Sequence, residues 1–84
     1  MRLSRVLGDK QDFSAKKPLV EIVGYKRVLV ENHFGIATYS TSEIQIKVLF
    51  GIICVTGSEL CLMNISREQL VITGCIEAVK ICRR

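Results

Sequence analysis

One histidine and a few carboxylates are the residues of this chain that could perform acid–base or nucleophilic chemistry. His33 is the only histidine among the 84 residues, and Glu31 and Glu43 are the carboxylates nearest to it in sequence. No aspartate follows Asp12, so a nucleophile and its base would lack the third group that usually orients the base. We therefore expect no catalytic residues and no enzymatic activity.

Four cysteines lie in the last third of the chain, in two pairs with C-x6-C spacing: Cys54 with Cys61, and Cys75 with Cys82. Structural zinc sites use closer pairs, so this spacing does not favour a metal site. The chain also lacks the glycine-rich motifs that bind phosphates and dinucleotides. We expect free thiols in a reducing compartment, no metal and no cofactor.

The basic charge is concentrated at the N-terminus. The formal net charge is +4, and residues 1–17 contribute five basic and two acidic side chains of that balance. We expect residues 1–17 to be a flexible or weakly ordered basic segment and residues 18–84 to be a single β domain. The sequence shows no secretory signal and no apolar run of about 18 residues, which predicts a cytoplasmic protein, free or peripheral at a membrane.

From Leu19 onward, short runs rich in isoleucine, valine and leucine alternate with glycine or polar turns every 8 to 10 residues. The turns are too short for crossover helices, so neighbouring strands should be antiparallel. This pattern predicts an all-β fold: a small antiparallel meander of about eight short strands, which allows folding over into a sandwich or roll.

The strand register follows from where the turns are placed. We place turns at residues 24–26, 33–34, 41–42, 50–51 and 57–58, and treat Gly74-Cys75 as a further break between strands. Tyr39 then lies opposite Ile44, and Cys54 lies opposite Cys61, close enough to crosslink if oxidised. One face of the sheet collects twelve predicted core residues: Ile22, Val28, Val30, Ala37, Tyr39, Ile44, Ile46, Val48, Ile53, Val55, Leu60 and Leu62.

Two places remain as candidate interaction surfaces. The face opposite the predicted core is mostly polar, but between residues 51 and 63 it carries Ile52, Cys54, Cys61 and Met63. Either the sheet folds over this apolar patch or a partner covers it. The second candidate is the predicted hairpin tip formed by Asn32, His33 and Gly35, which also has a purely structural interpretation as a turn.

The order of these segments resembles the YabP/YqfC family of small sporulation proteins, and the YqfC branch in particular. The similarity is carried by Val30 to His33, then Gly35, Tyr39-Ser40 and Glu43-Ile44, followed by the segments Gly51 to Gly57 and Leu70 to Gly74. It covers residues 18–82. The four cysteines and residues 1–17 do not belong to the matched pattern.

The resemblance implies a role in spore formation in the mother cell and a link to the larger membrane protein that is usually encoded beside the YqfC branch. It supplies no catalytic residues. We therefore expect a non-enzymatic assembly or adaptor module, located in the cytoplasm or peripherally at the membrane of the mother cell or forespore, with self-association allowed. The alternative is a small β domain that binds nucleic acid through residues 1–17, which the lack of a row of aromatic side chains disfavours.

Overall fold

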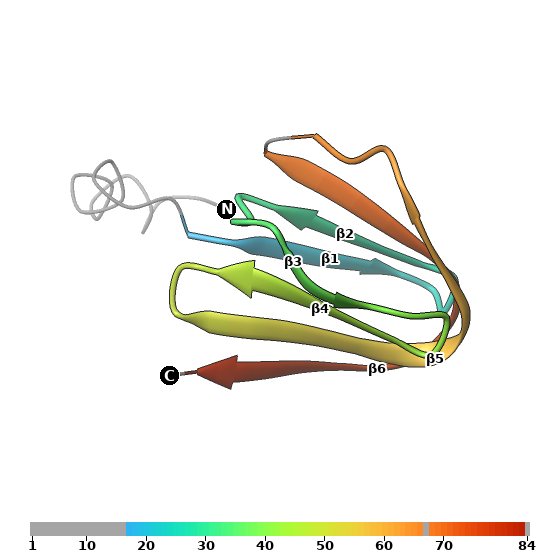
Figure 1. Ribbon diagram of the computed structural model, residues 1–84. Coiled ribbons are helices and arrows are strands. Elements are labelled where there is room, and N and C mark those ends of the chain that lie inside the picture. Colours follow the sequence, from blue (N-terminus) through green and yellow to red (C-terminus); the bar gives the residue numbers. More distant parts are fainter. Residues whose placement is uncertain (1–16, 67, 84) are drawn as a thin grey trace.

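The computed structural model describes residues 17–66 and 68–83, and strands are the only regular secondary structure in this part of the chain. Six strands form one antiparallel sheet in the order β1-β2-β6-β5-β4-β3 (Figure 1). Their bounds are β1 Leu19–Val23, β2 Arg27–Glu31, β3 Ile36–Tyr39, β4 Glu43–Val48, β5 Gly51–Met63 and β6 Gln69–Arg83. The predicted all-β antiparallel fold is confirmed. None of the described residues forms a helix that is long and apolar enough to cross a membrane.

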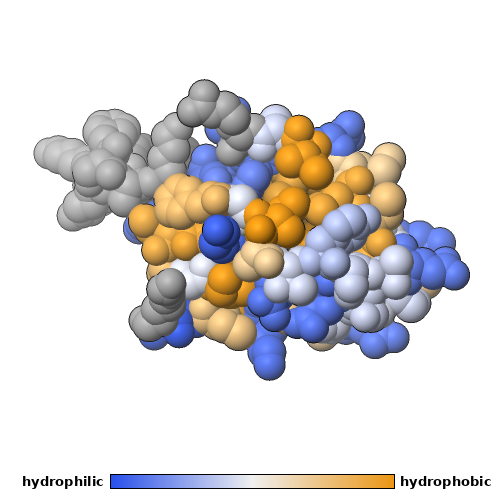
Figure 2. All heavy atoms as spheres, viewed as in Figure 1, coloured by the Kyte–Doolittle hydropathy of each residue, from blue (hydrophilic) through white to orange (hydrophobic). Residues whose placement is uncertain are grey.

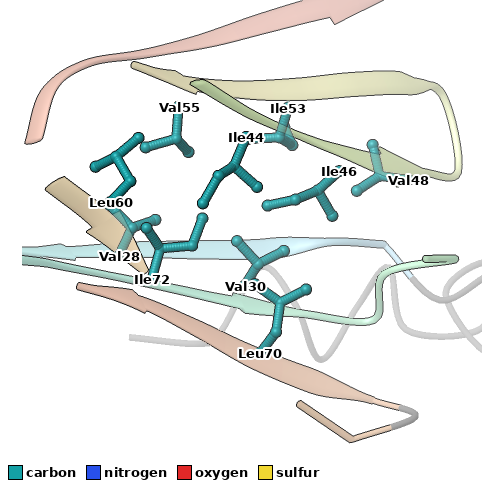
Figure 3. Packing of buried hydrophobic residues seen from close by; sticks show 10 residues of the cluster. All are labelled: Val28, Val30, Ile44, Ile46, Val48, Ile53, Val55, Leu60, Leu70 and Ile72. Atoms are coloured by element: carbon teal, nitrogen blue, oxygen red, sulfur yellow. The ribbon is translucent and has the colours of Figure 1, made fainter. Parts of the chain in front are cut away.

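The last two strands, β5 and β6, are long and bent, and both halves of the sheet share them. The second half of β5 and the first half of β6 extend the sheet from the β1–β2 hairpin. The first half of β5 and the second half of β6 extend it from the β3–β4 hairpin. The bend turns the two halves of the sheet toward each other, and their inner side chains meet between them (Figures 1 and 3). The sheet is therefore a single open layer rolled over its own core.

The predicted turn at Gly57-Ser58 is wrong, and so is the strand break at Gly74. Both glycines lie inside continuous strands, which is why the structure has six strands and not about eight. A Cβ atom at Gly57 would collide with the carbonyl oxygen of Cys75, and one at Gly74 would collide with the backbone of Glu59. These glycines let two bent backbones approach closely, which is a second use of glycine in strands besides turns.

The tips of the two hairpins hold the bends in place. The turn at residues 41–42 accepts hydrogen bonds from the bend of β5, and the turn at residues 25–26 accepts them from the bend of β6. At the bend of β5, Gly57 N lies 3.1 Å from Ser42 O, and Leu60 N lies 2.8 Å from Thr41 O. At the bend of β6, Gly74 N lies 3.2 Å from Lys26 O, and Ile76 N lies 2.7 Å from Tyr25 O. Each bend is thus part of the hydrogen-bonded sheet.

The predicted registers are partly confirmed. Ile22 lies opposite Val28, and Tyr39 lies opposite Ile44, as expected. The turn between β4 and β5 comes one residue earlier than predicted, so Ile46 faces Ile53 rather than Val55. A turn displaced by one residue shifts the pairing by two, which leaves every side chain on its predicted face. The predicted β2–β3 hairpin is wrong, because β2 pairs with β1 and β6.

The core consists of aliphatic side chains from four strands, β2, β4, β5 and β6. Figure 3 shows the group from β4 and the first half of β5 pointing toward the group from β2, β6 and the second half of β5. Ten residues make up this cluster: Val28, Val30, Ile44, Ile46, Val48, Ile53, Val55, Leu60, Leu70 and Ile72.

Three predicted core residues are exposed, namely Ile22, Ala37 and Tyr39. Ile22 is 53% exposed and Tyr39 is also 53% exposed, because they lie on β1 and β3, the outermost strands, where no neighbour covers their inner face. Ala37 lies at an irregularity in the β3–β4 pairing, and Ile36 takes the predicted place opposite Ile46.

Candidate interaction surface

The segment between β2 and β3 joins three parts of the molecule. Asn32 has a positive φ of 63° and turns the chain away from β2. Its backbone N–H donates to Glu68 O at 2.5 Å, and its side-chain Nδ2 donates to Lys17 O at 2.9 Å. Asn32 therefore ties the end of β2 to the β5–β6 loop and to the residue that precedes Pro18 and β1.

The imidazole of His33 is held by two backbone groups. Its Nδ1 accepts a hydrogen bond from the Gly35 N–H at 3.0 Å, and its Nε2 lies 2.9 Å from Ser66 O. Since Nδ1 must be the acceptor, Nε2 must carry the proton and donate to the carbonyl. This arrangement gives His33 a structural role, which was one of the two interpretations of this segment.

Phe34 is positioned by the same segment. Its N–H donates to Lys47 O at 2.7 Å, and Lys47 N–H donates to Gly35 O at 2.8 Å. Gly35 has a φ of 120°, a conformation that side chains other than glycine rarely adopt. The predicted hairpin tip is therefore a short link that runs along the end of β4 and presents the Phe34 ring there.

A hollow of about 510 Å³, lined mostly by apolar residues, opens at this end of the sheet. The side chains of Phe34, Leu49 and Phe50 are 57%, 45% and 37% exposed. We call this site the end hollow, and its lining consists of Phe34, Lys47, Val48, Leu49, Phe50, Gly51 and Ile52. Large apolar side chains are exposed on several parts of the surface, as Figure 2 shows for one face, but here they gather around a concavity.

The end hollow brings together parts of the two candidate surfaces. Ile52 comes from the apolar patch predicted on β5, and Phe34 stands between His33 and Gly35 of the other candidate. The remaining patch residues lie elsewhere. Cys61 and Met63 are on the second half of β5, beyond the bend, opposite Thr73 and Val71. Met63 is 45% exposed there.

The predicted pairing of Cys54 with Cys61 is wrong, because both lie on the same strand. Cys54 lies between Gln45 on β4 and Lys80 on β6 and is 8% exposed. Its Sγ donates a hydrogen bond to Glu43 Oε2 at 3.0 Å. Burial raises the pKa of the Cys54 thiol to about 11, and the hydrogen bond to Glu43 adds to the effect. Within residues 17–66 and 68–83, no group of three metal-ligating side chains occurs.

Glu43 forms a polar cluster with Cys54 and Gln45 on the outer face of the sheet. The pKa of Glu43 is lowered most by the hydrogen bond from Cys54. The hydrogen bond from Gln45 Nε2, at 2.8 Å, and the charge of Lys80 lower it by smaller amounts. A carboxylate with a lowered pKa stays ionised and is a poor proton donor at neutral pH. Glu43 lies on the outer face at the start of β4, whereas His33 contacts the opposite end of that strand through Gly35 and Lys47.

Sequence reasoning missed Leu49 and Phe50 as parts of a surface. The predicted turn at residues 50–51 contains Phe50, with Leu49 directly before it, and a turn is usually polar. Two consecutive large apolar residues at a hairpin tip, in the segment Val48-Leu49-Phe50-Gly51, were the available indication. The predicted nucleic-acid contact through residues 1–17 lies almost entirely outside the described residues, as does the predicted flexibility of that segment.

Comparison with known proteins bears on the identity of the chain. A model of the YabP family matches residues 14–83, a range that includes all six strands. The chain belongs to the YabP family. A protein of Bacillus subtilis (strain 168) described as "Uncharacterized protein YqfC" is 26% identical over 78 residues, which cover 93% of this chain and 84% of the relative. The YabP-family resemblance seen in the sequence is thus confirmed, and no solved structure matches the chain.

Proposed function

We propose that this YabP-family protein is a non-enzymatic adaptor that docks a partner protein at the end hollow during sporulation. The observation that carries the proposal is the group of exposed apolar side chains around that concavity. Solvent-exposed apolar clusters on small domains commonly mark sites where another molecule binds. Lys47 lines the same hollow and supplies a charge that can orient a partner with an acidic group.

The side chains best suited to chemistry support a role without catalysis. His33 uses both ring nitrogens to hold backbone groups, and Glu43 is held by Cys54 and Gln45. A general base needs a free lone pair directed at a substrate. In the part of the chain that the structure describes, both ring nitrogens of His33 are occupied, and the lowered pKa of Glu43 makes its carboxylate a weak base.

Family membership supports the biological setting of the proposal. The sequence resembles small sporulation proteins that act in the mother cell, and in particular the YqfC branch, which is usually encoded beside a larger membrane protein. We propose that this membrane protein is the partner, with the adaptor held peripherally at the membrane by that contact.

A capture experiment tests the proposal. Tagged protein is purified from detergent-solubilised membranes of sporulating cells, and the neighbouring membrane protein is quantified in the eluate. Wild-type protein should retain it. The double substitution Phe34→Ser with Leu49→Ser should reduce retention at least about tenfold, because burying two such side chains contributes several kcal/mol.

Two control variants locate the contact. Tyr25→Ser removes an equally exposed side chain at the other end of the sheet, where Tyr25 is 62% exposed, and should retain the partner. Met63→Lys tests the separate patch on the second half of β5. Retention by the folded double variant would exclude the end hollow as the docking site, and failure of the wild type to retain the membrane protein would overturn the proposed partner.

A further inference from the structure

The second half of β6 has a free edge. On one side, β2 pairs with β6 only from Gln69 to Thr73, and the β1–β2 turn bonds to Gly74 and Ile76. On the other side, β5 pairs with β6 as far as Arg83. From residue 77 onward, no strand of the described chain lies beside β6 on the β2 side, and Figure 1 shows this half at the border of the sheet.

This edge lacks the devices that protect the two terminal strands. Proteins limit unwanted strand pairing with short edge strands, prolines, bulges and charged side chains, lysine especially, and of these the edge of β6 has only its charged residues, with Lys80 at the centre. Strand β1 has five residues and follows Pro18, while β3 has four residues and an irregular register. Residues 78–83 of β6 instead pair with β5 without any shift in register.

The core-facing side chains on this edge are incompletely covered. Val79 and Ile81 lie opposite Val55 and Ile53, which are fully buried, so all four point to the inner face. Ile81 is nevertheless 57% exposed, and Val79 is only partly buried. A strand added at this edge would cover Ile81 from the side that is open.

We propose that the occupant of this edge is a second copy of the same chain, with segment 77–83 of each copy paired antiparallel about Lys80. The segment reads Glu-Ala-Val-Lys-Ile-Cys-Arg. In this register Val79 faces the partner subunit's Ile81 on the inner face, and Ala78 faces the partner subunit's Cys82 on the outer face. Glu77 and the partner subunit's Arg83 bring opposite charges together at each end.

The pairing places one like-charged contact on the symmetry axis, between the two copies of Lys80. Within each copy, Lys80 lies opposite Cys54, which donates a hydrogen bond to Glu43, and the positive charge of Lys80 acts on that carboxylate. Cross-strand pairs of opposite charge and of aliphatic side chains both stabilise neighbouring strands. Apart from Lys80, the segment is therefore self-complementary in charge and in apolar character, and the proposal does not depend on the role in sporulation.

Oligomeric state measured by sedimentation velocity across a concentration series tests the inference. The wild-type chain should form a dimer. Glu77→Arg and Arg83→Glu should each weaken association about tenfold, because each places like charges opposite one another twice per dimer. The double variant Glu77→Arg with Arg83→Glu restores opposite charges and should dimerise like the wild type. Circular dichroism checks that every variant keeps its strands.

Disulfide trapping tests the register. In a background with Cys54, Cys61 and Cys75 replaced by serine, Ala78→Cys should give an oxidised dimer through the partner subunit's Cys82. The control Val79→Cys points to the other face and should not crosslink to it. A chain that stays monomeric up to several hundred micromolar, a dimer indifferent to both charge reversals, or equal crosslinking of the two cysteine variants would overturn the proposal.

Discussion

At the scale of single residues, His33 and Asn32 form hydrogen bonds that join loops far apart in sequence. His33 joins the β2–β3 link to the β5–β6 loop, and Asn32 joins the end of β2 to Lys17 and Glu68. The residue types of this segment were compatible with an interaction site as well as with a purely structural turn. The deciding fact is that both imidazole nitrogens meet backbone groups that the rest of the fold puts there.

Replacing His33 tests its structural role. His33→Ala should lower the free energy of unfolding by about 1 to 2 kcal/mol, because two backbone groups lose their partner. His33→Asn provides a matched control, since its side-chain oxygen can still accept from Gly35 N–H but is too short to reach Ser66, so an intermediate loss is expected. Urea denaturation measures the difference. Equal stability of wild type and His33→Ala would contradict the assignment.

The Cys54 thiol should be much less reactive than the exposed thiols. Burial raises the pKa of Cys54 to about 11, so little thiolate forms near neutral pH. Because this pKa lies above the ordinary value of 9.0, the thiol contributes stability that is complete below pH 9.0 and is lost as the pH rises through about 11. Iodoacetamide labelling followed by mass spectrometry should modify Cys61, Cys75 and Cys82 first. Equal labelling of Cys54 in the folded protein would refute this expectation.

At the scale of elements, the two long strands decide the shape of the molecule. Gly57 and Gly74 permit the bends at which β5 and β6 cross closely, and the two hairpin tips bond to those bends. A sequence pattern shows that a glycine interrupts an apolar run. It does not show whether the chain reverses there or continues with a bend, because both need a position without a Cβ atom.

Alanine substitutions distinguish these glycines from an ordinary turn glycine. Gly57→Ala and Gly74→Ala should each destabilise the fold by more than about 2 kcal/mol, since the new methyl group would overlap backbone that has little room to move. Gly24→Ala is the control: Gly24 has a φ of 58° but open space around it, so a cost of about 1 kcal/mol is expected. Thermal denaturation ranks the three. A loss at Gly57 no larger than that at Gly24 would argue against the close crossing.

At the scale of the whole molecule, one aliphatic core holds the two halves of the rolled sheet together, and several exposed apolar side chains lie at its uncovered borders. The inner face of each outermost strand lacks a cover, which leaves Ile22 and Tyr39 half exposed. The end hollow forms where the β2–β3 link meets the β4–β5 turn. Neither the exposure nor the hollow belongs to any single strand.

Substitutions of two facing residues separate the true core from the predicted one. Ile44 is fully buried, whereas Tyr39, directly opposite, is 53% exposed. Ile44→Ala should cost about 3 kcal/mol, a large part of the stability of so small a domain. Tyr39→Ala should cost about 1 kcal/mol or less. Chemical denaturation of both variants provides the measurement, and a larger loss for Tyr39→Ala would show that β3 is covered in solution.

The sequence by itself determined the class of the fold and, outside β3 and β6, the face on which the aliphatic side chains lie. Alternation with a period of two fixes the face, and an error of one residue in a turn shifts the pairing by two and leaves the faces unchanged, as at β4–β5. It also placed Asn32, His33 and Ile52 among the candidate residues. Only the tertiary structure decided that β2 pairs with β6, that Gly57 is a bend, and that Phe34 meets Leu49 and Phe50. These are contacts between segments distant along the chain, and local periodicity carries no information about which strands become neighbours.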